Sequence, residues 1–358
     1  MKIMFTFLTF GKNIFGGIEH SLYNFILGLY KQGIDVSIYT SKTYSNTDVL
    51  DGINVYTSDY LQTTFTGKDK DIFINYRKNT DLIRKEFRTL YKEKKPDLIV
   101  CVDHLWGILP ILNMDIPCKK FLWLHVFHNK NLLKKVLKTD FDLFAVSQFL
   151  ANEMKTLTNK KINILPNSVI YSDFQLKNIP KNIIFCNARL SPEKRVIDAV
   201  KAFSLASQDN MELHLCSGSF PFGKIDKSLS EIKSFLESNP KVKVIFHKYF
   251  SWEELPKFIA SCNLIILPTE AESFGLSALE AMAGGIPLIT TDAGNLPYLI
   301  KESGIIVPVG DINRLKDAIL KVLQFGTNTA LGKKIAKQYD YLTVSKQFLK
   351  LLDLGGGI

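Results

Sequence analysis

Residues 268–287 read PTEAESFGLSALEAMAGGIP and directly follow the apolar run Leu264–Leu267. The apolar run predicts a buried strand, the polar residues after it predict a loop, and Ser277–Ala283 is predicted to be a helix. This stretch places one carboxylate, that of Glu272, in the loop and a second, that of Glu280, inside the helix. A strand, a loop and a helix in this order are the unit from which parallel α/β sheets are built.

The start of that helix predicts an anion site. Backbone N–H groups without partners and the positive end of the helix dipole meet at Phe274, Gly275 and Leu276, which makes this loop a seat for a phosphate or diphosphate. Helical side chains lean toward the N-terminus, so the carboxylate of Glu280 is expected within about 7 Å of the seat. Glu280 can then accept hydrogen bonds from a ribose diol, and Glu272 from a hydroxylated group on the other side of the phosphates.

The whole chain has the size and composition of a two-domain globular enzyme. Its 358 residues exceed one typical core, so two domains of roughly 170 residues are expected. No apolar run approaches the roughly 18 residues of a membrane span, and Met1–Met4 begins a strand and not a signal peptide, which predicts a cytoplasmic protein. The cysteines lack any C-x-x-C pair and are expected to be buried reduced thiols: Cys101, Cys118, Cys186, Cys216 and Cys262.

Positive charge is concentrated in the first half of the chain. The formal net charge is +10, and residues 1–170 contain 23 Lys and Arg against 16 Asp and Glu. Two basic segments, 77–95 and 130–138, have apolar residues at helical spacing. Such helices suit an anionic membrane surface, here the inner face of the membrane, or an acidic acceptor. They equally suit an apolar stripe on the core with a solvated lysine face, and both interpretations stay open.

Strands and helices alternate twice along the chain, on either side of a Pro- and Asn-rich linker at 166–182. This alternation predicts two doubly wound parallel sheets with a cleft between them, in which ligands bind at the carboxyl ends of the strands. The predicted strands and helices that matter most for the site are Leu98–Val102, Phe121–His125, Ile183–Asn187, Val196–Ala206, Glu212–Cys216, Val242–Phe246 and Pro287–Thr291, with a basic helix at Asp81–Lys94.

Two further groups of residues follow predicted strands. Gly16 and Gly17 come between the first strand and the first helix, either as a simple connector or as a turn whose backbone approaches a ligand. The turn matches neither the dinucleotide fingerprint nor a P-loop. Arg189 and Lys194 follow the first strand of the second half, where they either neutralise a diphosphate leaving group or are surface charges.

No residue pattern predicts a metal site. His125 ends an apolar strand and His128 follows it, without a carboxylate or cysteine at ligand spacing, so we expect hydrogen bonding or packing. The acidic triplets Asp69–Asp71 and Asp140–Asp142 do not follow strands, and both are expected to be surface charge. We therefore expect no metal and no cofactor.

Taken together these residues resemble the retaining glycosyltransferases of family 4, which have the GT-B fold. The stretch from Glu272 to Pro287 is the most specific match. The other matching pieces follow in the family's order: Gly16-Gly17-Ile18-Glu19 with its helix, Lys31 to Val36, Pro96-Asp97, His125 after a strand, Ala145-Val146-Ser147, Leu165 to Ser168, and Ala188 to Lys194. They extend through nearly the whole chain.

The resemblance assigns a role to each candidate residue. It implies that Glu272 contacts the donor sugar, that Glu280 holds the ribose, and that Arg189 and Lys194 bind the diphosphate. It further implies that amides near Gly275 and Leu276 assist, and that His125 and Gly17 line the donor site. The chain departs from the family at Ala188, Ser168 and His247, where glycine is frequent, and at Tyr298, where an acid is frequent. These departures concern the nucleotide-base contacts and loop details.

The resemblance also implies an organisation and a function. We expect an N-terminal Rossmann-like acceptor-binding domain at 1–170, a C-terminal Rossmann-like nucleotide-sugar domain at 171–336, and a last helix within 337–358 that crosses back to the first domain. The expected activity is metal-independent, retaining hexosyl transfer from a UDP- or GDP-type sugar to a hydroxyl of a glycan, glycolipid or small-molecule acceptor. A GT-B sugar-nucleotide epimerase and a catalytically silent sugar-nucleotide binding module are the alternatives. Nucleic acid is not an expected partner.

Overall fold

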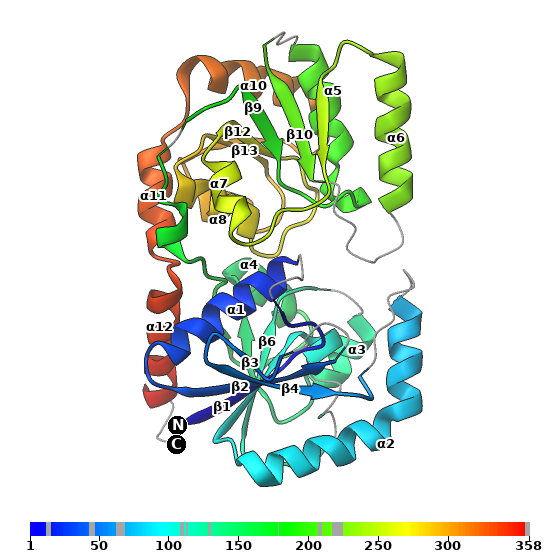
Figure 1. The fold of residues 1–358 in the computed structure, drawn as a ribbon, viewed down its shortest axis with the longest axis vertical. Coiled ribbons are helices and arrows are strands. Elements are labelled where there is room, and N and C mark those ends of the chain that lie inside the picture. Colours follow the sequence, from blue (N-terminus) through cyan, green and yellow to red (C-terminus); the bar gives the residue numbers. More distant parts are fainter. Residues whose placement is uncertain are drawn as a thin grey trace. The chain divides into compact units, whose positions relative to one another are not determined.

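Buried apolar strands build two separate parallel sheets, one in each of two compact units (Figure 1). The computed structural model describes residues 1–11, 16–42, 47–61, 69–107, 111, 114–127, 130–177, 179–206, 210–216 and 225–354. Unit 1 comprises residues 1–168 and 341–358, and unit 2 comprises residues 169–340. The sequence prediction divided the chain after residues 170 and 336.

The sheet of unit 1 has the strand order β3-β4-β2-β1-β5-β6-β7-β8. All its pairings are parallel except that of β3 with β4. Every residue of β5 is buried, as expected for a parallel strand covered on both faces. The strands are β1 (Lys2–Thr6), β2 (Asp35–Ser41), β3 (Val49–Leu50), β4 (Ile53–Ser58), β5 (Leu98–Val102), β6 (Lys119–Leu124), β7 (Asp142–Ala145) and β8 (Ile162–Ile164). The helices are α1 (Gly17–Tyr30), α2 (Asp69–Lys94), the π-helical turn η1 (Asp103–Gly107), α3 (Lys130–Val136), α4 (Gln148–Lys155) and α12 (Tyr341–Leu354).

The last helix of the chain, α12, is part of the core of unit 1, where it lies beside α1 (Figure 1). The ring of Phe348 is fully buried, and its centroid lies 5.3 Å from that of Phe25 on α1. A Cβ atom on Gly28 would lie 2.6 Å from the carbonyl oxygen of Tyr341, so the two helices approach as closely as a glycine allows. The hydrophobic core of unit 1 therefore contains residues from both ends of the chain.

The sheet of unit 2 has the strand order β11-β10-β9-β12-β13-β14, and all its pairings are parallel. This order reverses direction between β9 and β12, which makes the gap beyond their carboxyl ends the switch point where open α/β sheets bind ligands. The strands are β9 (Ile183–Cys186), β10 (Glu212–Cys216), β11 (Val244–His247), β12 (Cys262–Leu267), β13 (Leu288–Thr291) and β14 (Ile305–Val307). The helices are η2 (Tyr171–Phe174), η3 (Pro192–Lys194), α5 (Val196–Ala206), α6 (Ile225–Ser238), α7 (Glu254–Ile259), α8 (Leu276–Gly284), α9 (Leu296–Ile300), α10 (Ile312–Phe325) and α11 (Thr329–Lys337).

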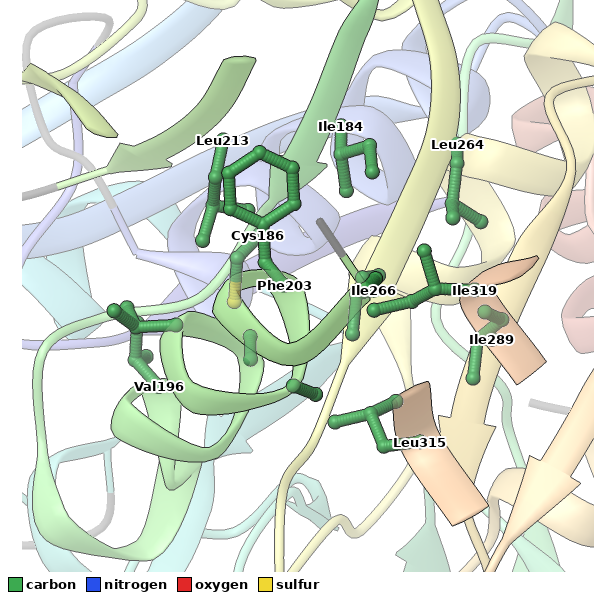
Figure 2. Packing of buried hydrophobic residues seen from close by; sticks show 14 of the residues in the cluster. Ile184, Cys186, Val196, Phe203, Leu213, Leu264, Ile266, Ile289, Leu315 and Ile319 are labelled. Atoms are coloured by element: carbon green, nitrogen blue, oxygen red, sulfur yellow. The ribbon is translucent and has the colours of Figure 1, made fainter. Parts of the chain in front are cut away.

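Helices cover both faces of this sheet. On one face α5 and α10 pack against alternate strand residues, with Phe203 near Leu213 and Ile319 beside Ile266 (Figure 2). On the other face α8 contacts β12 and β13 and is flanked by α7, α9 and α11. Because both faces are covered, the loops at the carboxyl ends of the strands are left to form a site.

Several predicted elements have the predicted bounds, namely Leu98–Val102, Val196–Ala206 and Glu212–Cys216. The strand predicted at Val242–Phe246 begins instead at Val244, because the amide of Val242 closes a turn on the carbonyl of Asn239. The helix predicted at Asp81–Lys94 begins at Asp69. Cys101, Cys186 and Cys262 are buried free thiols, as predicted, and burial raises the pKa of each to about 12. Cys118 and Cys216 are also free thiols but are only partly buried, so the prediction of burial was wrong for these two.

The basic helices place their apolar residues toward the core. Ile83 and Phe87 of α2 and Leu133 of α3 are fully buried. Lysines and arginines on these helices, including Lys85 and Arg88, are exposed. Among the described residues, the structure contains no helix with the length and hydropathy needed to span a bilayer.

Candidate active site

Two loops meet at the switch point of the unit 2 sheet. One follows β9 and carries Arg189 and Lys194; the other follows β12 and carries Glu272. They are joined through Glu193, whose carbonyl oxygen accepts a hydrogen bond from the amide of Glu270 at 2.9 Å. The same carbonyl accepts from the hydroxyl of Thr269 at 3.0 Å. The backbone thus holds the cationic loop and the acidic loop side by side.

Lys194 and Glu272 form an ion pair across the two loops. The Nζ atom of Lys194 lies 2.8 Å from Oε2 of Glu272 and donates a longer hydrogen bond, 3.4 Å, to the carbonyl of Ala271. The side chains are 17% and 24% exposed, so the pair is shielded but still reachable from solvent. An ammonium group has three donors, which leaves Lys194 one for a ligand.

Glu272 is held in its ionised form. Burial of the carboxyl group opposes ionisation, but the charge and hydrogen bond of Lys194 and the amides of Phe274 and Gly275 together lower its pKa below the ordinary value. The amide of Phe274 reaches Oε1 at 3.4 Å. At neutral pH the carboxylate therefore acts as a hydrogen-bond acceptor and not as an acid.

The loop between β13 and α9 packs against the backbone of Glu272. Gly294 has φ +55°, and a Cβ atom there would lie 1.9 Å from the carbonyl oxygen of Glu272. The amide of Asn295 donates to that same oxygen at 3.0 Å, and the Nδ2 group of Asn295 donates to the carbonyl of Phe274 at 2.8 Å. Neither Gly294 nor Asn295 was predicted as a site residue, although the run Asp292 to Asn295 has the composition of a turn.

Helix α8 begins without a capping side chain. Gly275 occupies the N-cap position with φ +105°, and no side chain caps the helix there. The first helical amides therefore lack intrahelical acceptors, as an anion seat requires. Leu276 and Ser277 at this start are partly exposed, whereas Phe274 is buried with its ring 5.7 Å from that of Tyr339.

Glu280 is buried one turn further along α8. The residue is only 3% exposed. Its Oε2 atom accepts a hydrogen bond from Nδ2 of Asn187 at 3.2 Å, directly after β9. Carboxylate oxygens are acceptors of the kind that suits the two hydroxyls of a diol. Asn187 was not singled out as a candidate from the sequence.

Arg189 is the most exposed of the predicted cations. Its side chain is 46% exposed, and its Nη2 atom lies 3.8 Å from Oε1 of Glu193. This contact is too long for a strong hydrogen bond. The guanidinium group is therefore loosely held and can reorient toward a ligand.

The other predicted site residues belong to unit 1. His125 follows β6, is 3% exposed, and its ring centroid lies 4.4 Å from that of Trp123. Neither ring nitrogen has a hydrogen-bond partner among the described residues. Burial lowers the pKa of His125 to about 4 against the opposing charge of Asp103, so the imidazole is neutral. Gly17 is the first residue of α1, next to its N-cap Gly16.

The remaining histidine and acidic candidates are described only in part. His128 and the side chains of Asp69 and Asp71 lie outside the described residues. Asp140 pairs with Lys120 at 2.6 Å, and neighbouring Asp142 is exposed. In the described part of the chain, no three His, Cys, Asp or Glu side chains are grouped to hold a metal ion.

Two of the departures from the family pattern have clear surroundings. His247 shares a 2.8 Å hydrogen bond with His214, and its ring centroid lies 4.8 Å from that of Phe250. Tyr298 is 70% exposed on α9. The histidine thus belongs to an aromatic cluster at the sheet edge, and the tyrosine faces solvent.

Solved structures of other proteins have the same fold. Sucrose-phosphate synthase from Thermosynechococcus elongatus superposes with a TM-score of 0.82, at 17% identity, covering 99% of this chain and 98% of that one. The Anabaena protein HepE, solved in complex with UDP and glucose, superposes with a TM-score of 0.75 at 18% identity, covering 98% of this chain and 99% of that one. The chain thus has the predicted GT-B fold, a class whose two α/β units each carry a parallel sheet.

Residues 171–338 match the model of the family described as Glycosyl transferases group 1. An alpha-1,3/1,6-mannosyltransferase of Saccharomyces cerevisiae is 25% identical over 354 residues, covering 80% of this chain and 69% of the yeast protein. The N-acetyl-alpha-D-glucosaminyl L-malate synthase of Bacillus anthracis is 28% identical over 210 residues, covering 54% of this chain and 53% of that protein. The chain spans about half the length of this second relative.

Proposed function

We propose that the chain is a metal-independent, retaining glycosyltransferase of family 4 that transfers a hexosyl group from a nucleoside-diphosphate sugar to a hydroxyl of an acceptor. One observation carries the proposal. The Lys194–Glu272 ion pair lies at the switch point of a Rossmann-type sheet, next to the uncapped start of α8. A cation and free helical amides suit a diphosphate, and an ionised carboxylate beside them suits a sugar hydroxyl. The UDP and UDP-glucose complexes of the Anabaena protein HepE are consistent with this ligand class.

The proposed mechanism requires little covalent chemistry from the protein. The sugar–phosphate bond breaks, the acceptor hydroxyl attacks the anomeric carbon from the same face, and an oxygen of the leaving phosphate takes the hydroxyl proton. Arg189, Lys194 and the α8 amides stabilise the charge that develops on the diphosphate. A pair of carboxylates on either side of the scissile bond, as in glycoside hydrolysis, is not needed.

The two glutamates divide the donor between them in this proposal. Glu272 is ionised and partly exposed, so it can accept hydrogen bonds from the sugar. Glu280 lies deeper, beside Asn187 at the end of β9, which suits a ribose. The assignment of His125 and Gly17 to the donor site remains a prediction from the family resemblance.

Acceptor binding by unit 1 and peripheral contact with an anionic membrane are part of the same proposal. Lys85, Arg88 and Lys92 recur at the spacing of one helix face on α2, and all three are exposed. None of them forms an ion pair with a described residue. Such a face suits anionic lipid headgroups. Co-sedimentation with vesicles of anionic lipid that fails, or that does not weaken with salt, removes the membrane part.

A panel of nucleotide sugars tests the function itself. A ligand at 100 times its dissociation constant adds about 2.7 kcal/mol to the free energy of unfolding, so the correct donor is expected to raise the melting temperature clearly. The stabilising donor is then incubated with the protein alone. Slow hydrolysis supports a transferase, isomerisation of the donor indicates an epimerase, and an unchanged donor indicates a binding module.

A further inference from the structure

Arg195, the residue after Lys194, has a backbone conformation that arginine rarely adopts. Its φ is +47°, in the left-handed region, immediately after the short helix η3. Glycine adopts this conformation without the steric cost that a Cβ atom brings. An arginine here must therefore gain its stability from what its side chain contacts.

The side chain of Arg195 bridges two elements. Its Nε atom donates to Oδ2 of Asp198 at 2.7 Å, and its Nη1 atom lies 3.3 Å from Oε2 of Glu270. Asp198 is in the first turn of α5 with a side chain only 6% exposed, whereas Glu270 is in the loop after β12. The guanidinium fork thus ties the start of α5 to the acidic loop.

This bridge runs beside the Lys194–Glu272 pair. Arg195 directly follows Lys194, and Glu270 precedes Glu272 by two residues. The backbone bond from the Glu270 amide to the Glu193 carbonyl joins the same two loops. Two neighbouring residues of one loop therefore hold two nearby residues of the other.

The loop after β14 also approaches this bridge. Gly310 has φ +78°, and a Cβ atom there would lie 3.1 Å from Nη2 of Arg195. Asp198 and Glu270 are bonded to Nε and Nη1 of this guanidinium group, whose side chain is 32% exposed. Two carboxylate partners within the protein favour a structural use of the charge over direct contact with a diphosphate.

We propose that Arg195 is a positioning residue, which with Glu270 and Asp198 fixes the spacing between Lys194 and Glu272. The inference rests on the proposed function, because that spacing matters only if Lys194 stabilises a leaving diphosphate while Glu272 holds the sugar. Displacements of about 1 Å in such a pair can lower turnover by a factor of order 10². Binding of the free nucleotide, which does not need the sugar contact, is expected to be much less sensitive.

The test compares Arg195→Gly, Arg195→Lys and Glu270→Gln with the wild type on the full chain. Arg195→Gly removes the bridge without backbone strain, and Glu270→Gln removes one charge at constant size. We expect both to lower kcat for donor hydrolysis by about 10-fold or more while the Kd for UDP or GDP changes less than about 3-fold. Arg195→Lys keeps a positive charge at this position, so its kcat for donor hydrolysis is expected to lie between those of Arg195→Gly and the wild type. The matched control is Glu231→Gln, which removes the surface ion pair of Glu231 with Lys201 in the same unit.

Two outcomes overturn the inference. A wild-type kcat in Arg195→Gly shows that the bridge does not position the site. A Kd for the nucleotide that rises 10-fold or more in Arg195→Gly but not in Glu270→Gln shows that Arg195 binds phosphate directly.

A second readout does not depend on activity. Hydrogen exchange of the Glu270 amide, which is bonded to Glu193, is expected to quicken about 10-fold in Arg195→Gly and not in the Glu231→Gln control. If the wild type neither binds a nucleotide nor hydrolyses any donor, the proposed function fails. The exchange rate of the Glu270 amide still shows whether the Arg195 bridge holds the two loops together. An unchanged exchange rate in Arg195→Gly overturns that structural role of Arg195.

Discussion

The carboxyl ends of the two sheets carry opposite kinds of chemistry. In unit 2 the switch point holds neighbouring ion pairs, Lys194 with Glu272 and Arg195 with Glu270. In unit 1 the end of β6 holds His125, which is buried, neutral and without a hydrogen-bond partner among the described residues. Related strand orders thus place paired charges at this end of one sheet and a buried, neutral histidine at this end of the other. The fold supplies positions, and the side chains decide what they can bind.

Removing the cations of unit 2 is expected to give the largest effect. Lys194→Ala should lower turnover by a factor of order 10² or more, because the ammonium group stabilises developing charge on the diphosphate. Arg189→Ala should act in the same direction. Rates of donor hydrolysis and transfer are the measurement, and wild-type rates in both variants would contradict the charged role of this site.

Separate substitutions of the two glutamates are expected to have the next largest effect. Glu272→Gln is expected to lower sugar transfer about 10-fold or more while sparing binding of the free nucleotide, because its partner is the sugar. Glu280→Gln is expected to weaken nucleotide binding by roughly 10-fold, the cost of one charge-assisted hydrogen bond. Calorimetry with the nucleotide alone separates the two, and the opposite pattern would exchange their roles.

The support behind Glu272 is tested by Gly294→Ala. The new Cβ atom would collide with the carbonyl of Glu272 at a positive φ, so the free energy of unfolding should fall by about 2 kcal/mol or more. The matched control is Gly326→Ala, since Gly326 also has a positive φ but no atom within 4 Å of the added Cβ. For Gly326→Ala we expect the free energy of unfolding, measured by chemical denaturation, to fall by about 1 kcal/mol. Equal losses in both variants would show that the contact with Glu272 carries no special cost.

The neutral histidine of unit 1 predicts a smaller, pH-dependent effect. The pKa of His125 is lowered to about 4 in the folded protein, from 6.5, so the unfolded chain binds the proton more readily. The contribution of the neutral imidazole to the free energy of unfolding is therefore fully present above pH 6.5 and is lost as the pH drops toward 4. The loss is about 1 kcal/mol at pH 5.5. Denaturation at pH 7.5 and 5.5 measures it. His125→Gln should remove the contribution of this histidine to the pH dependence of the free energy of unfolding. An unchanged pH dependence in that variant would assign the contribution to other groups.

Local patterns predicted the elements but not the contacts between them. The strand before Glu272 and the helix after Gly275 follow from an apolar run, a glycine and helical spacing, which are all local signals. The hydrogen bond between Asn187 and Glu280 joins residues 93 positions apart, so it depends on how β9 and β12 pair. The left-handed backbone of Arg195 is equally invisible in its sequence, because only tertiary partners make an arginine acceptable there.

The place of α12 in the core of unit 1 decides the order in which the units can be completed during synthesis. Unit 2 is one continuous segment, so all of its core residues have left the ribosome once residue 340 has. Unit 1 still lacks Phe348, whose ring fills the space between Phe25, Phe121 and Phe144. A nascent chain therefore carries an unfinished first unit, with an apolar gap beside α1, throughout the synthesis of the second. Residues of the first unit thus reach their final packing only after the whole second unit has been made.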